Sequence, residues 1–304
     1  MPSTKVLRRR IRSVTSTQQI TKAMEMVAAA KLRRAQARAL ATRPYAIKLT
    51  GILENLAAVA RERELPLFAA REVKHTALVV VTSDRGLCGG FNTNLFRAAE
   101  ERLRKAAEPA GNPPGHPPKA GPGAGRGSLA LVIVGRKGRD YFRRRGWPVL
   151  ATYADLGTEA NVEAARRITA DLLRRFESGE VDRVEILYTR FFSALRRQVT
   201  CETFLPIGAE PAADRPAAAG DVIFEPGLEA IFEALLPRFA SARMLAALAD
   251  SRASEEGARM TAMGAATKNA GELLDGLVLQ RNRLRQSMIT REILDIVGGA
   301  EALR

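Results

Sequence analysis

The sequence predicts a mixed α/β fold: a long antiparallel coiled coil of N- and C-terminal helices plus a central Rossmann-like α/β domain. Three observations predict this fold. Apolar residues recur at helical spacing over both ends of the chain, and short apolar runs alternate with helical patterns between them. Both ends also carry faces of small residues, which allow two helix axes to approach closely.

The apolar pattern of residues 222–304 predicts one very long helix. Its apolar residues follow the three-then-four spacing of a helix seam, which only Thr267 and Arg281 interrupt. The seam residues are Met260, Met263, Ala270, Leu274, Leu277, Leu284 and Met288. A helix over 228–298 would be about 100 Å long at ~1.5 Å per residue, longer than a domain of this size needs. The length of this predicted helix therefore indicates that the helix has a functional role.

Three glycines in this pattern, Gly257, Gly264 and Gly271, are spaced seven residues apart. A glycine inside a helix costs roughly 1 kcal/mol relative to alanine, so a repeated glycine indicates a backbone that another element approaches closely. We expect that element to be the amino-terminal helix, because residues 28–41 are rich in alanine.

The amino-terminal helix is predicted over 1–63. Ser3 or Thr4 can cap its start, and the helical pattern ends near Arg63, before Pro66. Pro44 falls inside the pattern. We expect it to kink or interrupt the helix, because proline lacks an amide hydrogen and clashes with the preceding turn.

Between the two helices, residues 73–208 predict a small α/β domain, since strand-like and helical patterns alternate there. The expected strands are 76–82, 129–134, 149–153, 182–190 and 198–205, the last two forming a hairpin, and the expected helices are 91–105, 137–145 and 159–177. Residues 108–128 are dominated by Gly, Pro and Ala and predict a flexible surface loop, and 209–220 predict a second loose connection.

The charge of the chain is concentrated at its amino-terminal end. The formal net charge is +15. Residues 1–43 hold eleven Lys/Arg and one Glu, a net +10, whereas residues 222–304 hold ten Lys/Arg and eleven Asp/Glu, a net −1. This balance predicts an acidic partner, which could be nucleic acid, anionic lipid or an acidic protein surface.

Two cysteines predict no disulfide framework and favour a reducing compartment. The apolar runs are short, as at 129–134, so no membrane span is expected. The basic start lacks the apolar core of a secretory signal.

The motif SDRGLCGGFN at 83–92 follows a predicted strand and precedes a predicted helix, which is where a phosphate loop would lie. Its glycines lack the spacing and the Lys-Ser/Thr pair of known nucleotide loops. The alternative is a tight glycine turn in which Asp84 or Asn92 caps the helix.

No catalytic constellation is found in the sequence. Cys88 would need a base, and the only histidines are His75 and His116, the latter inside the predicted flexible loop. No spacing of His, Cys and carboxylate residues predicts a metal site. We therefore expect no catalytic, cofactor-binding or metal-binding residues.

The basic amino-terminal face leaves a nucleic-acid stripe open as an alternative function. Against it, no aromatic residue precedes Tyr45, and no base-reading motif is found. A Rossmann-type nucleotide enzyme is a third hypothesis.

Three segments resemble the signatures of one family, the γ subunits of F-type ATP synthases. They are ITKAMEMVAAAKL at 20–32, SDRGLCGGFN at 83–92, and a carboxyl-terminal pattern that includes ASE at 253–255, ARM at 258–260, RQ at 285–286 and IT at 289–290. They occur in the family's order and extend over nearly the whole chain.

The resemblance implies a non-catalytic rotor shaft. In this family the terminal helices form a coiled coil inside a ring of three α and three β subunits. The α/β domain sits below with the ε subunit on a membrane ring of c subunits, at the cytoplasmic face of the bacterial membrane. Ion flow, of protons or sometimes sodium, turns the ring, and the asymmetric shaft drives ATP synthesis or hydrolysis on β.

The resemblance also implies the residues that contact the α/β ring. Arg285, Gln286 and Thr290 match residues that contact β near the top of the shaft, and Met24 matches a region facing acidic loops of β. The apolar tip, with Ile293, Ile296, Val297 and Leu303, is expected in a bearing at the top of the ring. Three features depart from the family pattern: Arg281 stands where an aromatic residue is usual, Ser287-Met288 differ from the usual pair, and the 108–128 loop is long and has no cysteine pair.

Overall fold

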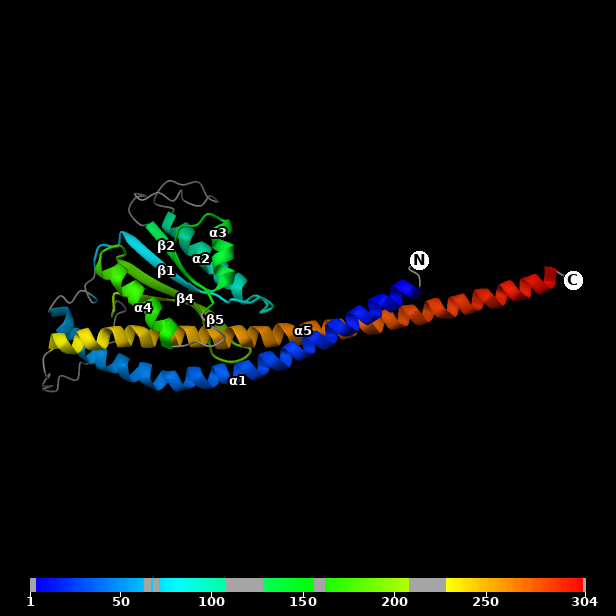
Figure 1. The fold of residues 1–304 in the computed structure, drawn as a ribbon, viewed down its shortest axis with the longest axis horizontal. Coiled ribbons are helices and arrows are strands. Elements are labelled where there is room, and N and C mark those ends of the chain that lie inside the picture. Colours follow the sequence, from blue (N-terminus) through cyan, green and yellow to red (C-terminus); the bar gives the residue numbers. More distant parts are fainter. Residues whose placement is uncertain are drawn as a thin grey trace. The chain divides into compact units, whose positions relative to one another are not determined.

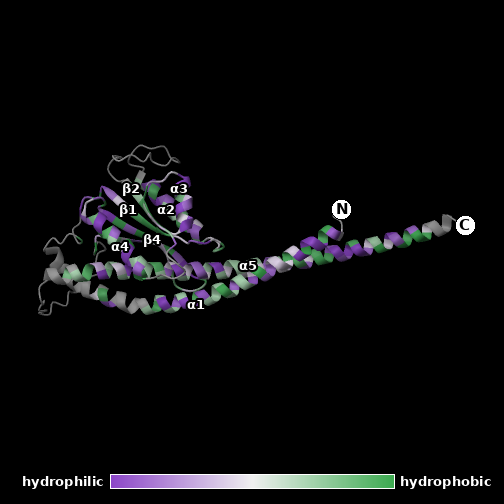
Figure 2. Cartoon of the chain, viewed as in Figure 1, coloured by the Kyte–Doolittle hydropathy of each residue, from purple (hydrophilic) through white to green (hydrophobic). Residues whose placement is uncertain are grey.

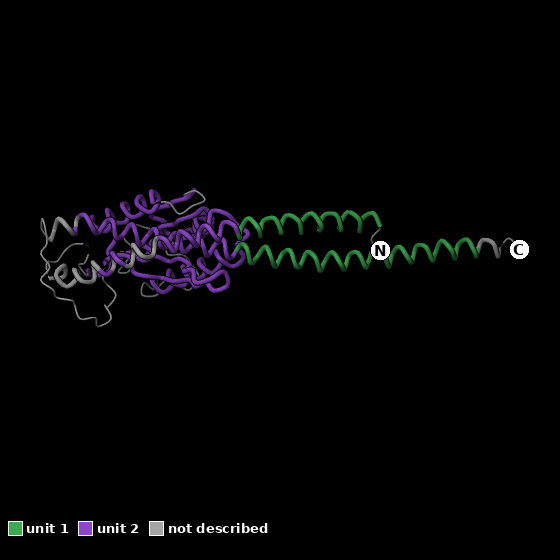
Figure 3. The backbone as a smooth tube through the Cα atoms, turned by 90° about the horizontal axis from the view of Figure 1, so that it is seen from below, with its two compact units in different colours: residues 1–29, 259–304 green, residues 30–258 purple. Residues whose placement is uncertain are grey.

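The computed structural model of the chain describes residues 4–62, 67, 71–107, 128–155, 162–207 and 228–302. It contains two compact units, residues 1–29 with 259–304 (unit 1) and residues 30–258 (unit 2), coloured separately in Figure 3. Two long helices, α1 (Thr4–Glu62) and α5 (Leu228–Ala302), contribute to both units. The predicted terminal helices are therefore confirmed. The expected interruption at Pro44 is wrong, because α1 continues through this residue, as α5 does through Pro237.

Unit 2 contains a five-stranded sheet in the order β3-β2-β1-β4-β5 (Figure 1). β1 pairs in parallel with β2 and β4, and β2 pairs in parallel with β3, whereas β4 and β5 form an antiparallel hairpin. The elements are β1 (His75–Val81), α2 (Phe91–Ala107), β2 (Ser128–Val134), α3 (Arg136–Arg144), β3 (Val149–Tyr153), α4 (Val162–Glu177), β4 (Arg183–Phe191) and β5 (Arg197–Leu205). The predicted strands and helices are all found, with small shifts at their ends. The 108–127 and 209–220 segments and the first residues of the 159–177 helix lie outside the described residues.

The central strand β1 divides the apolar core of unit 2 into two layers. Leu78 and Val80 face α2 and α3, while Ala77, Val79 and Val81 face α4 and the first part of α5. This follows from the period-two alternation of side chains along a strand. Figure 2 shows the hydrophobic strands lying between helices whose outer faces are hydrophilic. Because both faces are covered, β1 reads as a continuous apolar run rather than an alternating one.

In unit 1 the first part of α1 pairs with the last part of α5 in antiparallel register. Thr267 Oγ1 donates to Thr21 Oγ1 at 2.9 Å. A Cβ built on Gly264 would lie 3.4 Å from the Glu25 carboxylate, and one on Gly271 would lie 3.0 Å from Gln18 Nε2. Two of the three heptad glycines are thus explained by close approach of α1. The break in the seam at Thr267 is a polar contact between the two helices.

Candidate functional site

The loop between β1 and α2 is held by its own side chains. Asn92 Nδ2 donates to Ser83 Oγ at 2.8 Å and to Cys88 Sγ at 3.3 Å, and Asn92 Oδ1 accepts from the Ser83 amide at 3.1 Å. Cys88 is buried at 2 % exposure. Leu87, by contrast, has a φ of 64° and is 59 % exposed. The side chain of Asn92 therefore braces the turn through Ser83 and Cys88, which differs from the expected cap of the following helix.

The same loop also binds the amino-terminal end of α3. The first three amide groups of α3 donate to Asp84 Oδ1 at 2.9 Å, to the Ser83 carbonyl oxygen at 3.0 Å and to Thr82 Oγ1 at 3.0 Å. Asp84 thus serves α3, not the helix that directly follows the loop. The amide groups at the amino-terminal end of α3 are therefore satisfied by oxygen atoms of the loop after β1.

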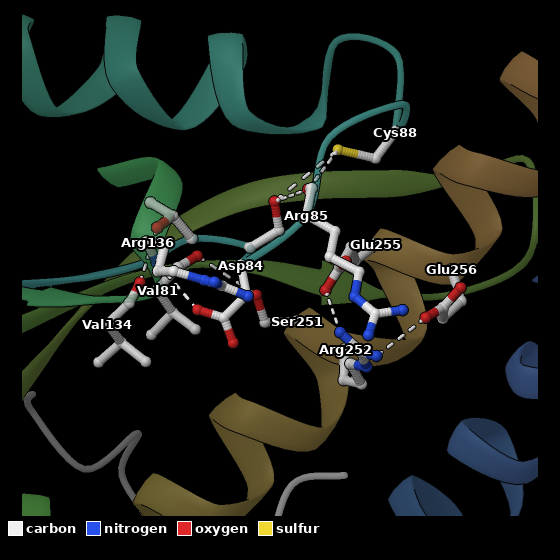
Figure 4. Close-up of polar contacts among 12 residues, drawn as sticks. Val81, Asp84, Arg85, Cys88, Val134, Arg136, Ser251, Arg252, Glu255 and Glu256 are labelled. Atoms are coloured by element: carbon white, nitrogen blue, oxygen red, sulfur yellow. Dashed lines mark hydrogen bonds and ion pairs between the residues drawn. The ribbon is translucent and has the colours of Figure 1, made fainter. Parts of the chain in front are cut away.

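Helix α5 lies against the carboxyl ends of β1 and β4 (Figure 4). The strand order reverses between these two strands, and doubly wound sheets usually bind ligands in the crevice at such a point. Ser251 Oγ donates to the carbonyl oxygen of Val81 at 3.4 Å, and Ser254 Oγ donates to that of Thr189 at 3.0 Å. The two serines are 3 % and 0 % exposed. A helix of the chain itself therefore occupies the usual ligand position, which argues against the nucleotide-enzyme hypothesis.

A buried ionic cluster lies on the same turns of α5. Arg252 forms ion pairs with Glu255 at 2.7 Å and with Glu256 at 3.0 Å. The two glutamates are 3 % and 1 % exposed, and Figure 4 shows Arg85 pointing from the loop after β1 toward Arg252 and Glu255. Buried carboxylates require such partners, because an unpaired charge in the interior is very unfavourable.

The hairpin between β4 and β5 meets α5 one turn further on. A Cβ built on Gly257 would lie 3.2 Å from Arg197 Nη1 and 3.6 Å from the Ala194 carbonyl oxygen. Burial lowers the pKa of Arg197. The third heptad glycine is thus explained by the hairpin, and the expected approach of the amino-terminal helix at this position is wrong.

The ring-contact residues implied by the sequence fall into two separate places in unit 1. Met24 is half-buried on α1, directly before Glu25, whose carboxylate lies close to Gly264 of α5. Arg285, Gln286 and Thr290 are exposed on α5, about 30 Å further along its axis at ~1.5 Å per residue. The structure does not bring the two groups together.

Near the end of α5, the described side chains are exposed. Following the register from Gln18–Gly271, Thr4 of α1 falls opposite ~residue 285 of α5, and among the described residues α5 continues alone beyond it (Figure 3). Every described side chain from Arg285 to Gly298 is exposed. These include Ile293 at 55 %, Ile296 at 72 % and Val297 at 58 %. Leu303 lies outside the described residues.

Other sequence hypotheses are resolved or limited by the structure. Arg281 is half-buried, and its Nη2 donates to Asn282 Oδ1 at 3.2 Å. Burial raises the pKa of the Cys201 thiol to about 11, which keeps it protonated at neutral pH.

In the described part of the chain, no group of three or more His, Cys, Asp or Glu residues could hold a metal ion. None of the described helices has the length and apolar character to cross a membrane.

The serines and acidic residues of 251–257 were not recognised as a site from the sequence. Their signal is a helical stretch in which small and charged residues surround the whole circumference without an apolar stripe. Such a stretch is buried only when polar groups of another element meet it. That condition is met here by the strand ends.

Comparisons with known proteins agree with this architecture. A family model described as ATP synthase matches residues 3–303. The chain is 47% identical to the ATP synthase gamma chain of Moorella thermoacetica, with 98% of each chain covered. It is 43% identical to that of Heliobacterium modesticaldum over the full length of both.

Solved structures share the fold. A chain of the Euglena gracilis mitochondrial ATP synthase assembly of OSCP, F1 and c-ring is similar, with a TM-score of 0.63 at 20% identity, 99% of this chain and 94% of that chain being covered. A chain of the Tetrahymena thermophila mitochondrial ATP synthase central stalk and c-ring gives a TM-score of 0.60 at 24% identity, covering 81% and 99%.

Proposed function

This chain belongs to the ATP synthase gamma chain family, the rotor subunits of F-type ATP synthases, and we propose that it turns as a non-catalytic shaft between an ion-driven membrane ring and the catalytic subunits. It would carry rotation of the c-ring to three β sites and so couple ion flow to ATP synthesis or hydrolysis. Its partners would be the α and β subunits, the ε subunit and the c-ring. The complex would lie at the cytoplasmic face of a bacterial membrane, with this chain peripheral to it.

The observation that carries the proposal is the free end of α5. This stretch of α5 is exposed and displays isoleucine and valine, and no other described residue covers it, so it needs another surface around it. An apolar surface with few directional bonds suits a bearing, since it allows rotation without one deep energy minimum. Ile293, Ile296 and Val297 would form this contact.

Polar residues just before the apolar end suit a role in transmitting force. Arg285, Gln286 and Thr290 are exposed along about one and a half turns of α5. We assign them to contacts with β loops, and Met24 to a second contact lower on the shaft. The proposed domains are the helix of 1–63, the α/β domain of 73–208 with its 108–128 loop, and the helix of 222–304.

Reconstitution tests the function. The chain is combined with α and β subunits, and assembly and ATP hydrolysis are measured. A stable complex whose hydrolysis depends on this chain is expected. No complex and no change in hydrolysis would exclude the proposal, and a salt-dependent shift of duplex DNA at physiological ionic strength would favour the nucleic-acid alternative.

The Arg285 contact is tested in the complete enzyme in vesicles. Arg285→Ala should lower ATP-driven proton pumping, because a charged contact with β is removed. Unaltered pumping would contradict this role for Arg285. Lys268→Ala, which removes an exposed cation of α5 that pairs with Glu272 at 3.9 Å, is the matched control.

A further inference from the structure

We propose that residues 251–257 of α5 form a rotational lock between the shaft helix and the α/β sheet, with Ser254 as its main positioning residue. The inference rests on the proposed rotor function and concerns how torque passes inside the chain. If the α/β domain is turned by the membrane ring, the angle between its sheet and α5 must hold under load. The lock supplies that angle.

Three contacts with three parts of the sheet fix the rotation of α5. Ser251 binds the end of β1, Ser254 binds β4, and Gly257 lies against the β4–β5 hairpin. The two serines bind backbone carbonyl oxygens of β1 and β4, and Gly257 lies against Ala194 in the hairpin turn and Arg197 at the start of β5. The spacing of three residues places them along one side of the helix.

Rotation of α5 by one position would disrupt these contacts. Neighbouring residues of a helix are about 100° apart around its axis. The residues next to Ser254 are Ala253, which has no donor, and Glu255, whose carboxylate would face the carbonyl oxygen of Thr189 instead of a positive partner. Two acceptors facing each other in a buried place repel, so the helix is held at one angle.

The charged side chains of the same turns pair with one another within α5. Glu255 and Glu256 are buried and both pair with Arg252. Because these pairs lie within α5, they turn with the helix, and the angle is set by the contacts of Ser251, Ser254 and Gly257 with the strands and the hairpin. From this point α5 continues as one helix to Ala302, so the angle set at 251–257 is passed along its backbone.

The experiment uses the complete enzyme in vesicles and measures protons pumped per ATP hydrolysed, against an increasing opposing membrane potential. Ser254→Leu places a large side chain where Ser254 is fully buried, and should lower the pumping ratio increasingly with load while hydrolysis is retained. Ser178→Leu, an exposed serine at the end of α4, is the control and should behave as wild type.

Each outcome decides the matter. Equal losses of hydrolysis and pumping in Ser254→Leu, or a ratio that stays at the wild-type value under load, would overturn the lock. If Ser254→Leu does not assemble, the double variant Ser251→Ala/Ser254→Ala decides: a ratio that falls with load supports the lock, and an unchanged ratio overturns it. Failure of the wild-type chain to support any pumping would instead contradict the rotor function itself.

Discussion

Two stretches of the same helix reverse the usual relation between polarity and burial. Residues 251–258 of α5 contain two serines, one arginine and two glutamates, and Ser254 is fully buried. Residues 285–298 contain three isoleucines with leucine and valine, and every described side chain there is exposed. The first stretch buries polar side chains, and the second exposes apolar side chains beside its polar ones.

The difference teaches that burial along α5 is set by what lies beside each stretch. The buried stretch meets the carbonyl oxygens of strand ends, which demand hydrogen-bond donors. The exposed stretch is covered by no other described residue, and we propose that another protein covers its apolar side chains. Substitutions in the buried stretch should therefore lower the stability of the isolated chain, whereas substitutions in the exposed stretch should weaken its assembly with α and β subunits.

The largest expected effect follows loss of the arginine in the buried stretch. Arg252→Met leaves Glu255 and Glu256 without that partner and should destabilise the isolated chain by about 3–5 kcal/mol, as for other broken buried ion pairs. Denaturant unfolding measures it. Arg283→Met, an exposed arginine of the same helix, should change stability little, and an equal loss for both would remove the contrast between the stretches.

The next effect is overpacking of the buried stretch. Ala253 is fully buried, so Ala253→Leu should cost about 1–3 kcal/mol, whereas the matched Ala265→Leu at an exposed position of α5 should not. Thermal unfolding of both variants makes the comparison. Equal melting temperatures would show that α5 is not tightly packed at Ala253.

A partly buried carboxylate should show an intermediate, pH-dependent effect. Burial raises the pKa of Asp171, but hydrogen bonds from Tyr153, Arg175 and Arg174 outweigh it and hold the pKa below its ordinary value. Asp171 therefore contributes stability above its ordinary pKa of ~3.9, and this is lost as pH falls through the lower folded value. The difference in unfolding free energy between wild type and Asp171→Asn should become smaller as pH is lowered from 6 toward that range. Unfolding free energies measured at pH values ~one unit apart check this. A gap that widens in acid would contradict the assignment.

The smallest effect on the isolated chain belongs to the exposed stretch. Ile296→Ser should change its unfolding free energy by less than ~0.5 kcal/mol, since no packing is lost. The same variant should weaken assembly with α and β subunits, measured by the yield of complex at limiting concentration. A destabilised chain with normal assembly would reverse the interpretation of this stretch.

The sequence predicts the architecture well, because periodicity reports which face of an element is apolar. β1 is recognised by its unbroken apolar run, and Gly264 and Gly271 predict the close approach of α1. Periodicity does not predict contacts between residues that lie far apart in the sequence. Nothing near Ser254 in the sequence indicates that its partner is Thr189, and Asp84 caps a helix that starts 52 residues later.

Hydrogen–deuterium exchange along α5 tests the contrast between its two stretches most directly. Amides of 251–258 should exchange slowly both in the isolated chain and in the complex with α and β subunits, because the chain itself buries them. Amides of 286–302 should exchange rapidly in the isolated chain and become protected on assembly. Slow exchange at 286–302 before assembly, or no gain in protection after it, would contradict the account.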